Sequence, residues 1–142
     1  PLGITDLEWV QMPGSGEFAA AWGLRLRPRD MAKLGQLVIS HGIWKGKPIV
    51  SAEWIKEATT GRFPVVDTNY YYGYQWWISS SLVNGNKIDW LEALGLGSQR
   101  IIIVPSLDLV VVFTAGLYEM QNSWVTTTRL LDDYILPAVV GP

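Results

Sequence analysis

The chain has 142 residues, of which 49% are hydrophobic and 17% charged, a balance that predicts a single globular domain over residues 1–142. Its formal net charge of −2, without any block of basic residues, argues against nucleic acid as a partner. There are no cysteines, which excludes disulfides and thiolate metal sites, and no apolar run approaches the roughly 18 residues that a membrane-spanning helix needs.

The first third of the chain predicts irregular structure, then a strand and a helix. Residues 1–21 show no sustained period, whereas residues 22–27 alternate apolar and other side chains as a short, half-exposed strand does. Pro28 suits the first position of a helix, and Gly42 suits its C-terminal cap. We therefore expect a helix over residues 28–40. The apolar residues that recur on one face of this helix are Met31, Leu34, Leu37 and Val38.

The middle of the chain predicts a turn, a second helix and an aromatic strand. Residues 44–48 combine glycine and proline as a tight turn does, and Ser51 is a good N-cap for a helix over residues 52–60. A loop follows over residues 62–69. The run Tyr-Tyr-Tyr-Gly-Tyr-Gln-Trp-Trp-Ile at residues 70–78 has strong strand propensity.

Two apolar runs later in the chain predict an antiparallel hairpin. Asn-Gly at residues 84–85 marks a reverse turn into a short strand over residues 87–92. Residues 101–104 and 109–113 are rich in β-branched side chains, and the intervening Pro-Ser-Leu-Asp is made of turn formers. Neither run alternates with polar residues, so we expect both faces of the hairpin to be covered, a central place in the sheet, and helices on at least one face.

A last helix is capped by Asn122 or Ser123, carries apolar residues at helical spacing from Trp124 to Ile135, and is expected to end at Pro137. The order of elements predicts an α+β domain, with a small antiparallel sheet and flanking helices.

The residues alone do not identify an activity. There is no Ser-x-x-Lys and no Gly-x-Ser-x-Gly, so neither lysine-activated nor elbow-type serine catalysis can be assembled from this chain. Gly95-Leu96-Gly97 lacks the remainder of a phosphate-binding loop, and these glycines could equally serve only to start a strand.

The charged residues give no catalytic constellation either. Asp132 and Asp133 are adjacent on a helix, so their side chains point about 100° apart and are predicted to be solvated surface. Arg100 is also expected on a solvated face. The single histidine, His41, cannot build a histidine metal site and favours a structural role at a helix end. No spacing implies pairing among four glutamates, Glu8, Glu17, Glu53 and Glu92.

Several stretches in the same order resemble one enzyme family. The more specific are Arg-Pro-Arg-Asp-Met at residues 27–31 and Tyr-Gly-Tyr-Gln-Trp-Trp at residues 72–77. The other matching stretches are residues 1–6, 23–35, 42–47, 52–55, 95–99, 101–105 and 107–112. Together they resemble the serine hydrolases related to class C β-lactamases and penicillin-binding proteins, including esterases and amide hydrolases of the 6-aminohexanoate-dimer hydrolase type.

This resemblance implies that the chain is the C-terminal part of a β-lactamase/transpeptidase-like fold. In that family, the nucleophilic serine and the lysine of Ser-x-x-Lys, together with a later tyrosine, lie upstream of the region matched here. The chain would then contain no catalytic side chain, and on its own it is expected to be inactive. Neither a metal nor another cofactor is implied. A periplasmic or extracellular location is favoured by the resemblance, although no leader segment opens this chain.

The resemblance places the third family motif, a basic residue followed by Ser/Thr and Gly, on Ala93-Leu94-Gly95. Only the glycine matches, which disfavours recognition of a penicillin-type carboxylate and favours a small ester, amide or peptide-like substrate. The main-chain N–H of Leu96 would help hold the oxyanion, a contribution typically worth about 3 kcal/mol in the transition state. Gln99 would either contact substrate or serve as structure at the strand end.

The aromatic strand offers further candidate contacts and an alternative function. Tyr72, Tyr74 and Trp76 could line a wall of the substrate cleft, although a core role is the default for each. They could instead dock a peptide or glycan in a module without turnover. A third possibility is a subunit that pairs its hairpin edge with another chain. The expected partner is either the N-terminal part of the same enzyme or a second copy of this chain.

Overall fold

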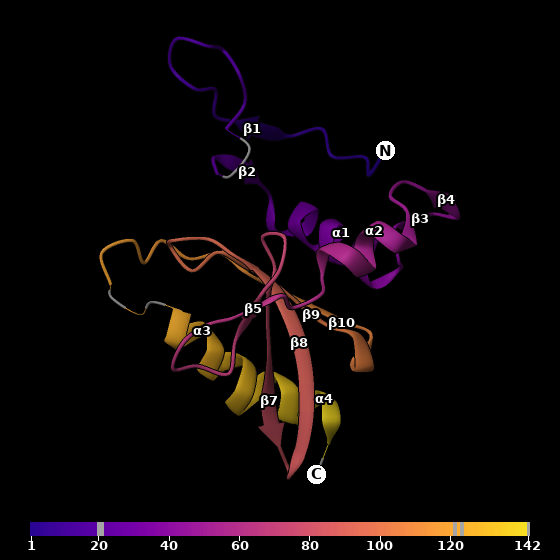
Figure 1. The fold of residues 1–142 in the computed structure, drawn as a ribbon, viewed down its shortest axis with the longest axis vertical. Helices are drawn as coiled ribbons and strands as arrows, with labels where there is room; N and C mark the ends of the chain where they lie inside the picture. The colour runs from indigo at the N-terminus through magenta and orange to yellow at the C-terminus, as the bar shows by residue number, and fades with distance from the viewer. Residues whose placement is uncertain (20–21, 121, 123, 142) are drawn as a thin grey trace.

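The structure, a computed structural model, describes residues 1–19, 22–120, 122 and 124–141 (Figure 1). The strands of its main sheet are β5 (Phe63–Pro64), β6 (Tyr71–Tyr72), β7 (Trp77–Val83), β8 (Asn86–Leu94), β9 (Arg100–Val104) and β10 (Leu109–Phe113). They pair in the order β10-β9-β8-β7-β6-β5, and every pairing is antiparallel. The predicted α+β class with a small antiparallel sheet is therefore confirmed.

Helices cover both faces of this sheet. On one face, α1 (Pro28–Ile39) packs Met31 and Leu34 against a buried cluster that includes Ile101 and Ile103. On the other face lies the C-terminal helix, made of α3 (Trp124–Leu130), η2 (Leu131–Ile135) and α4 (Leu136–Val140). Figure 1 shows this helix, in yellow, on the opposite side of the strands from α1. The alternation of side chains along β8 and β9 thus serves two cores at once.

The predicted hairpin is formed by β9 and β10, with Val104 opposite Leu109. A short 3-10 helix, η1 (Pro105–Leu107), and the left-handed residue Asp108 (φ 46°) make the connection. The expected central position is wrong for β10, which is an edge strand of the sheet. Its apolar run reflects coverage of its two faces by helices, which does not require a partner strand on each side.

Helix α1 ends as a Schellman motif. The N–H of Gly42 donates to the carbonyl of Leu37 at 2.8 Å, and the N–H of His41 donates to that of Val38 at 3.0 Å. The predicted helix is confirmed, but it is His41 (φ 51°) that first takes the left-handed conformation. Gly42 follows with φ 84°, and a Cβ there would lie 2.0 Å from the carbonyl oxygen of Val50.

The next segment follows the prediction closely. Strands β3 (Ile43–Trp44) and β4 (Lys47–Pro48) form the expected tight turn. Helix α2 (Ala52–Ala58) begins at Ser51, whose hydroxyl accepts a hydrogen bond from the N–H of Trp54 at 3.1 Å.

The N-terminal residues are more ordered than expected. Strand β2 (Leu24–Leu26) was predicted, but its partner β1 (Leu7–Trp9) lies in the stretch expected to be irregular. The three residues of β1 are too few to show a period, and their pairing depends on residues far along the chain. The two strands form an arm that projects beyond α1 in Figure 1.

The aromatic stretch is a tight hairpin rather than the single strand expected over residues 70–78. Strands β6 and β7 pair with each other, and Tyr72 lies opposite Trp77. The reversal occurs at Gly73, whose N–H donates to the carbonyl of Trp76 at 2.8 Å, and at Gln75, which has φ 63°. A Cβ at residue 73 would lie 2.6 Å from the carbonyl oxygen of Thr60, so the glycine is required by close packing.

The C-terminal helix passes through Pro137 and reaches Val140, so the expected end at this proline is wrong. The preceding turn, Leu131–Ile135, is a π-helix, and Pro137 lies in the first turn of α4. A π-turn shifts the hydrogen-bond register, which lets the helix continue although proline has no N–H. Of the two predicted caps, Ser123 lies outside the described residues.

A buried ion pair crosses the sheet beneath this helix. Arg100 and Glu92 are both 0% exposed, and Nε of Arg100 donates to Oε2 of Glu92. Nη1 of Arg100 donates to the hydroxyls of Thr127 and Thr128, each at 2.9 Å. The expected solvated position of Arg100 is therefore wrong, and nothing in the sequence indicated that Glu92 is its partner.

The surroundings of this pair shift two ionisation equilibria. Burial raises the pKa of Glu92, and the hydrogen bond and charge of Arg100 oppose that rise. Burial also raises the pKa of Tyr70, and the nearby charge of Glu92 adds to this effect. Tyr70 therefore remains a neutral phenol at neutral pH.

Replacing Arg100 alone should destabilise the fold strongly. Arg100→Met leaves the Glu92 carboxylate buried without its partner, so we expect the free energy of unfolding to fall by about 3–5 kcal/mol. The double variant Glu92→Met/Arg100→Met should lose less free energy of unfolding than either single variant, because no charge is left unpaired. Urea unfolding followed by circular dichroism measures both. Arg25→Met, which breaks an exposed pair with Glu8, is the control and should change stability by about 0.5 kcal/mol at most.

Candidate functional site

The predicted motif lies at the end of β8, where the chain turns into β9. Ala93 and Leu94 are the last residues of β8, and Ala93 packs against the core beneath α1. A reverse turn follows, in which the N–H of Ser98 donates to the carbonyl of Gly95 at 2.9 Å. The N–H of Gly95 donates to the carbonyl of Gln99 at 2.8 Å, which closes the turn onto β9.

The side chain of Gln99 fills the inside of this turn. Its Oε1 accepts a hydrogen bond from the N–H of Gly97 at 3.1 Å, and its Nε2 donates to the carbonyl of Ala115 at 2.6 Å and to the hydroxyl of Tyr118 at 2.8 Å. A Cβ at residue 95 or 97 would come within 2.8 Å or 2.6 Å of this amide. A larger residue at 97 would therefore press on both the Gln99 amide and the Tyr118 ring, whereas at 95 it would displace only the end of the Gln99 side chain.

Leu96 occupies the outer corner of the turn. It is 85% exposed, and its N–H donates no hydrogen bond to any described residue. Neither Leu96 nor Gly97 has a positive φ, which fits a type I turn with Leu96 at its second position. Leu96 therefore has a main-chain N–H without a described partner, at the exposed corner of a turn that its neighbours hold in place.

The three aromatic candidates lie in different surroundings. Tyr72 meets Trp77 edge to face with 4.8 Å between ring centroids, and Trp76 packs against the core under α1. Tyr74 is 48% exposed and stacks on Trp54, with 5.7 Å between centroids and 13° between ring planes. None of these residues, and none of residues 93–99, lines either of the two cavities described next.

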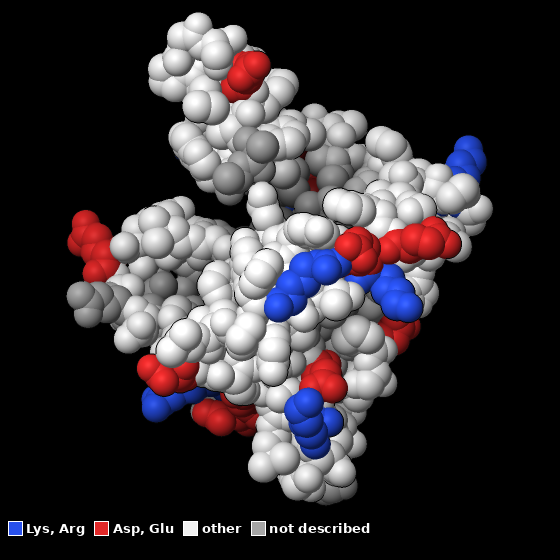
Figure 2. Space-filling view, viewed as in Figure 1, with Lys and Arg blue, Asp and Glu red and all other residues white. Residues whose placement is uncertain are grey.

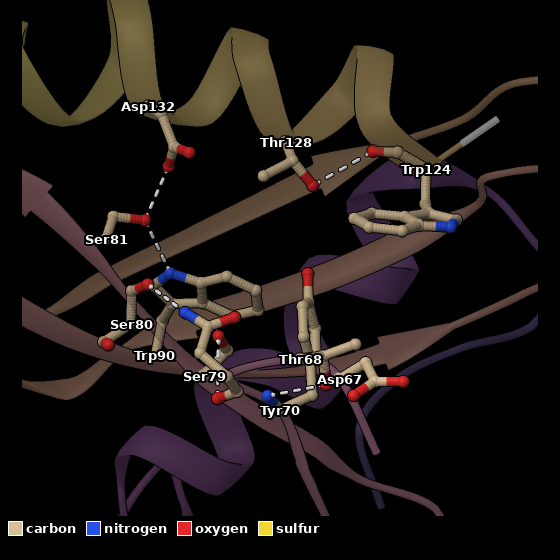
Figure 3. A pocket seen from close by; sticks show the side chains of 11 residues that line it. Asp67, Thr68, Tyr70, Ser79, Ser80, Ser81, Trp90, Trp124, Thr128 and Asp132 are labelled. Carbon is tan, nitrogen blue, oxygen red and sulfur yellow. Dashed lines mark hydrogen bonds between the residues drawn. The ribbon is translucent and has the colours of Figure 1, made fainter. Parts of the chain in front are cut away.

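A cavity of about 720 Å³ lies between β7, β8 and the C-terminal helix (Figure 3). A chain of hydrogen bonds runs through it: Nε1 of Trp90 donates to the Ser81 hydroxyl at 2.8 Å, and that hydroxyl donates to Oδ1 of Asp132 at 2.5 Å. The expectation that Asp132 is plain solvated surface is therefore wrong, whereas Asp133 is exposed. Serines at alternate positions of β7, Ser79 and Ser81, were the sequence signal for a polar site, but it is visible only once the strand is known.

A second cavity of about 600 Å³ lies between α1, α2 and the sheet. Its wall includes His41, Glu53, Lys56 and Asp108 beside apolar side chains such as Ile55. Within the described part of the chain, no group of three potential metal-binding side chains is found. This cavity therefore presents mixed charges without a constellation for catalysis.

The face shown in Figure 2 and the described helices show no feature typical of a polyanionic partner or of a membrane-spanning segment. On the face shown in Figure 2, acidic and basic side chains lie near one another instead of gathering by sign. No described helix has the length and apolar character needed to cross a membrane.

Comparison with known proteins shows one recurring name. No family model matches the chain. The 6-aminohexanoate-dimer hydrolase of Paenarthrobacter ureafaciens is 25% identical in an alignment of 99 residues that covers 63% of this chain and 24% of that protein. The solved structure named "Putative 6-aminohexanoate-dimer hydrolase from Bacillus anthracis" matches with a TM-score of 0.65 and 23% identity, over 83% of this chain and 30% of the other.

These matches confirm the resemblance inferred from the sequence motifs and the fold expected from it. The chain spans less than a third of the length of either protein. The comparisons do not test the roles of residues 93–99 or of the aromatic residues, so those roles remain predictions.

Proposed function

We propose that residues 1–142 form the C-terminal lobe of a β-lactamase-related serine hydrolase that cleaves esters or amides through an acyl-enzyme. The similarity to 6-aminohexanoate-dimer hydrolases supports hydrolase chemistry. The chain has no Ser-x-x-Lys. By its resemblance to the family, the nucleophilic serine, the lysine and the tyrosine are proposed to come from a preceding part of the enzyme. The single observation that carries the proposal is the main-chain N–H of Leu96, which has no partner among the described residues.

The geometry suits an oxyanion donor. When the serine oxygen attacks an acyl carbon, the carbonyl π electrons move onto its oxygen, which becomes an oxyanion. A main-chain N–H aimed at this oxygen stabilises the transition state without any reorganisation, provided that it is held rigidly. Gln99 supplies that rigidity, because its amide bonds both Gly97 and Ala115. We therefore assign Gln99 to positioning of the turn, with Tyr72, Tyr74 and Trp76 as the proposed cleft wall.

The substrate is proposed to be a small ester, amide or peptide-like molecule. Ala93 and Leu94 offer neither a cation nor a hydroxyl, so this strand end provides nothing to bind a substrate carboxylate. A neutral acyl group lying along the strand fits these residues better than a penicillin-type acid.

The partner of this lobe is proposed to be the preceding part of the same enzyme or, failing that, a second copy of the chain. Strand β10 is an edge of the sheet, and an open edge is a template for another strand. The arm of β1 and β2 adds exposed apolar side chains. They include Leu7, Trp9, Met12, Phe18, Trp22 and Leu24.

The proposed donor can be removed without removing the turn. Proline is favoured at the second position of a type I turn and has no N–H, so Leu96→Pro in the complete enzyme should lower kcat by about 10²–10³-fold. Hydrolysis of a p-nitrophenyl ester measures this. Leu96→Ala keeps the N–H and serves as the matched control, which should retain nearly full kcat. Equal activity of the two variants would exclude Leu96 as the oxyanion donor.

The isolated 142-residue chain should be inactive because it has no nucleophile. We expect neither turnover of the same ester nor labelling by a fluorophosphonate probe, whereas the complete enzyme should show both. Near-ultraviolet circular dichroism of the tryptophans checks that the isolated chain is folded. Labelling of the folded chain would refute the missing-nucleophile argument.

Saturable quenching of tryptophan fluorescence by peptidoglycan fragments, without turnover by the complete protein, would favour the binding-module alternative.

The isolated chain should also self-associate. Contiguous apolar surface well above about 600 Å² is unusual on monomers, and the arm and the β10 edge would both be uncovered. Sedimentation velocity should show dimers or larger species that dissociate when the preceding part of the enzyme is added. A monodisperse monomer at high protein concentration would count against this proposal.

A further inference from the structure

The cavity beneath the C-terminal helix has the properties of a small-molecule site. Its volume of about 720 Å³ falls within the range of about 300–1,000 Å³ that is usual for such sites. None of residues 93–99 lines it, so it is separate from the proposed hydrolytic strand end. Its walls come from β7, β8 and the loop before β6 on one side, and from the C-terminal helix on the other (Figure 3).

The charge of this cavity has one sign. Asp67 and Asp132 line it, and no lysine, arginine or histidine is among its lining residues. Asp132 forms no ion pair with a described residue, and only its Oδ1 accepts a hydrogen bond. The second oxygen points away from Ser81 in Figure 3, which leaves it available to a ligand.

The orientation of the Asp132 carboxylate is fixed by buried groups. The indole of Trp90 is 2% exposed and donates to the Ser81 hydroxyl, so the proton of that hydroxyl is directed at Asp132. Ser81 itself is 6% exposed. A carboxylate held in this way is preorganised, so a cation that approaches it does not have to order the side chain first.

Aromatic rings line the same cavity as the carboxylate. Tyr70 meets Trp90 and Trp124 edge to face, with centroid separations of 5.6 Å and 5.9 Å. Aromatic faces attract organic cations and also pack against aliphatic carbon. Because the pKa of Tyr70 is raised by burial, its ring carries no negative charge and its hydroxyl stays protonated.

We propose that this cavity binds a small organic ammonium ion, with the nitrogen at Asp132 and the carbon chain against Trp90 and Tyr70. A neutral polyol would also suit aromatic walls and hydroxyls, but it would leave the charge of Asp132 uncompensated. An anion would be repelled by both carboxylates. The single sign of the charge therefore selects the cation.

The test compares three probes of similar size on the complete protein: n-butylammonium chloride, 1-butanol and sodium butyrate. Titration calorimetry at constant ionic strength should show saturable binding of butylammonium only. Asp132→Asn keeps a side-chain oxygen for Ser81 but loses the charge, and should weaken binding by about tenfold. Asp133→Asn is the matched control, since the neighbouring residue is exposed and does not line the cavity, and it should bind as the unmodified protein does.

A second measurement needs no variant. In nuclear magnetic resonance spectra, butylammonium should shift the indole N–H signal of Trp90, which reports on the Ser81–Asp132 chain. The indole signal of Trp54, which does not line the cavity, should stay in place. The proposal would be overturned if butanol bound as tightly as butylammonium, or if Asp132→Asn left the affinity for butylammonium unchanged. It would also be overturned if the Trp90 signal did not move, or if the complete protein showed no saturable binding. The last result would mean that another part of the enzyme fills the cavity.

Discussion

The buried pair of Glu92 and Arg100 is the interaction on which both proposed sites rely. Glu92 lies in β8 and Arg100 in β9, so the pair ties together the two strands that flank the glycine turn. The same guanidinium reaches Thr127 and Thr128 and thereby fixes α3 over the sheet. Burying two charges costs free energy, which their mutual attraction and their hydrogen bonds offset. The offset is incomplete, because Oε1 of Glu92 and Nη2 of Arg100 have no hydrogen-bond partner among the described residues. The turn at Leu96 and the cavity at Asp132 both depend on this arrangement.

Local signals in the sequence were sufficient for elements that local chemistry determines. Pro28 and Ser51 mark helix starts, and Asn84-Gly85 marks a turn, because each acts through its own backbone or the next few residues. The prediction of a single strand over residues 70–78 was wrong because strand propensity does not reveal where the chain reverses direction. Here the reversal depends on Gly73 lying against Thr60. The prediction that Arg100 is solvated was wrong for a similar reason. Its partners Glu92 and Thr127 are distant in sequence, and nothing in the composition indicates that they meet.

The candidate site also contains some features that the sequence could predict and others that depend on distant residues. The family resemblance located the glycine turn and implied the role predicted for the main-chain N–H of Leu96. The function of the Gln99 amide as the filling of that turn could not be predicted, since Ala115 and Tyr118 lie more than ten residues away. The Asp132 cavity was missed altogether, because Ser81 and Asp132 are 51 residues apart and meet only when the helix packs on the sheet.

The two proposed sites share strand β8 but use its surroundings in different ways. At the turn between β8 and β9, the polar atoms of Gln99 are hydrogen-bonded within the chain. The group left for a ligand is the main-chain N–H of Leu96. On the sheet face under the C-terminal helix, polar and aromatic side chains line a cavity. One carboxylate oxygen of Asp132 has no hydrogen-bond partner there among the described residues and can accept one from a ligand. A main-chain donor stabilises charge that develops on any acyl oxygen, whereas a fixed carboxylate among aromatic rings selects by charge. Substitutions on that face can therefore change which ligand is held while leaving the geometry of the turn intact, provided that Arg100 keeps the helix in place.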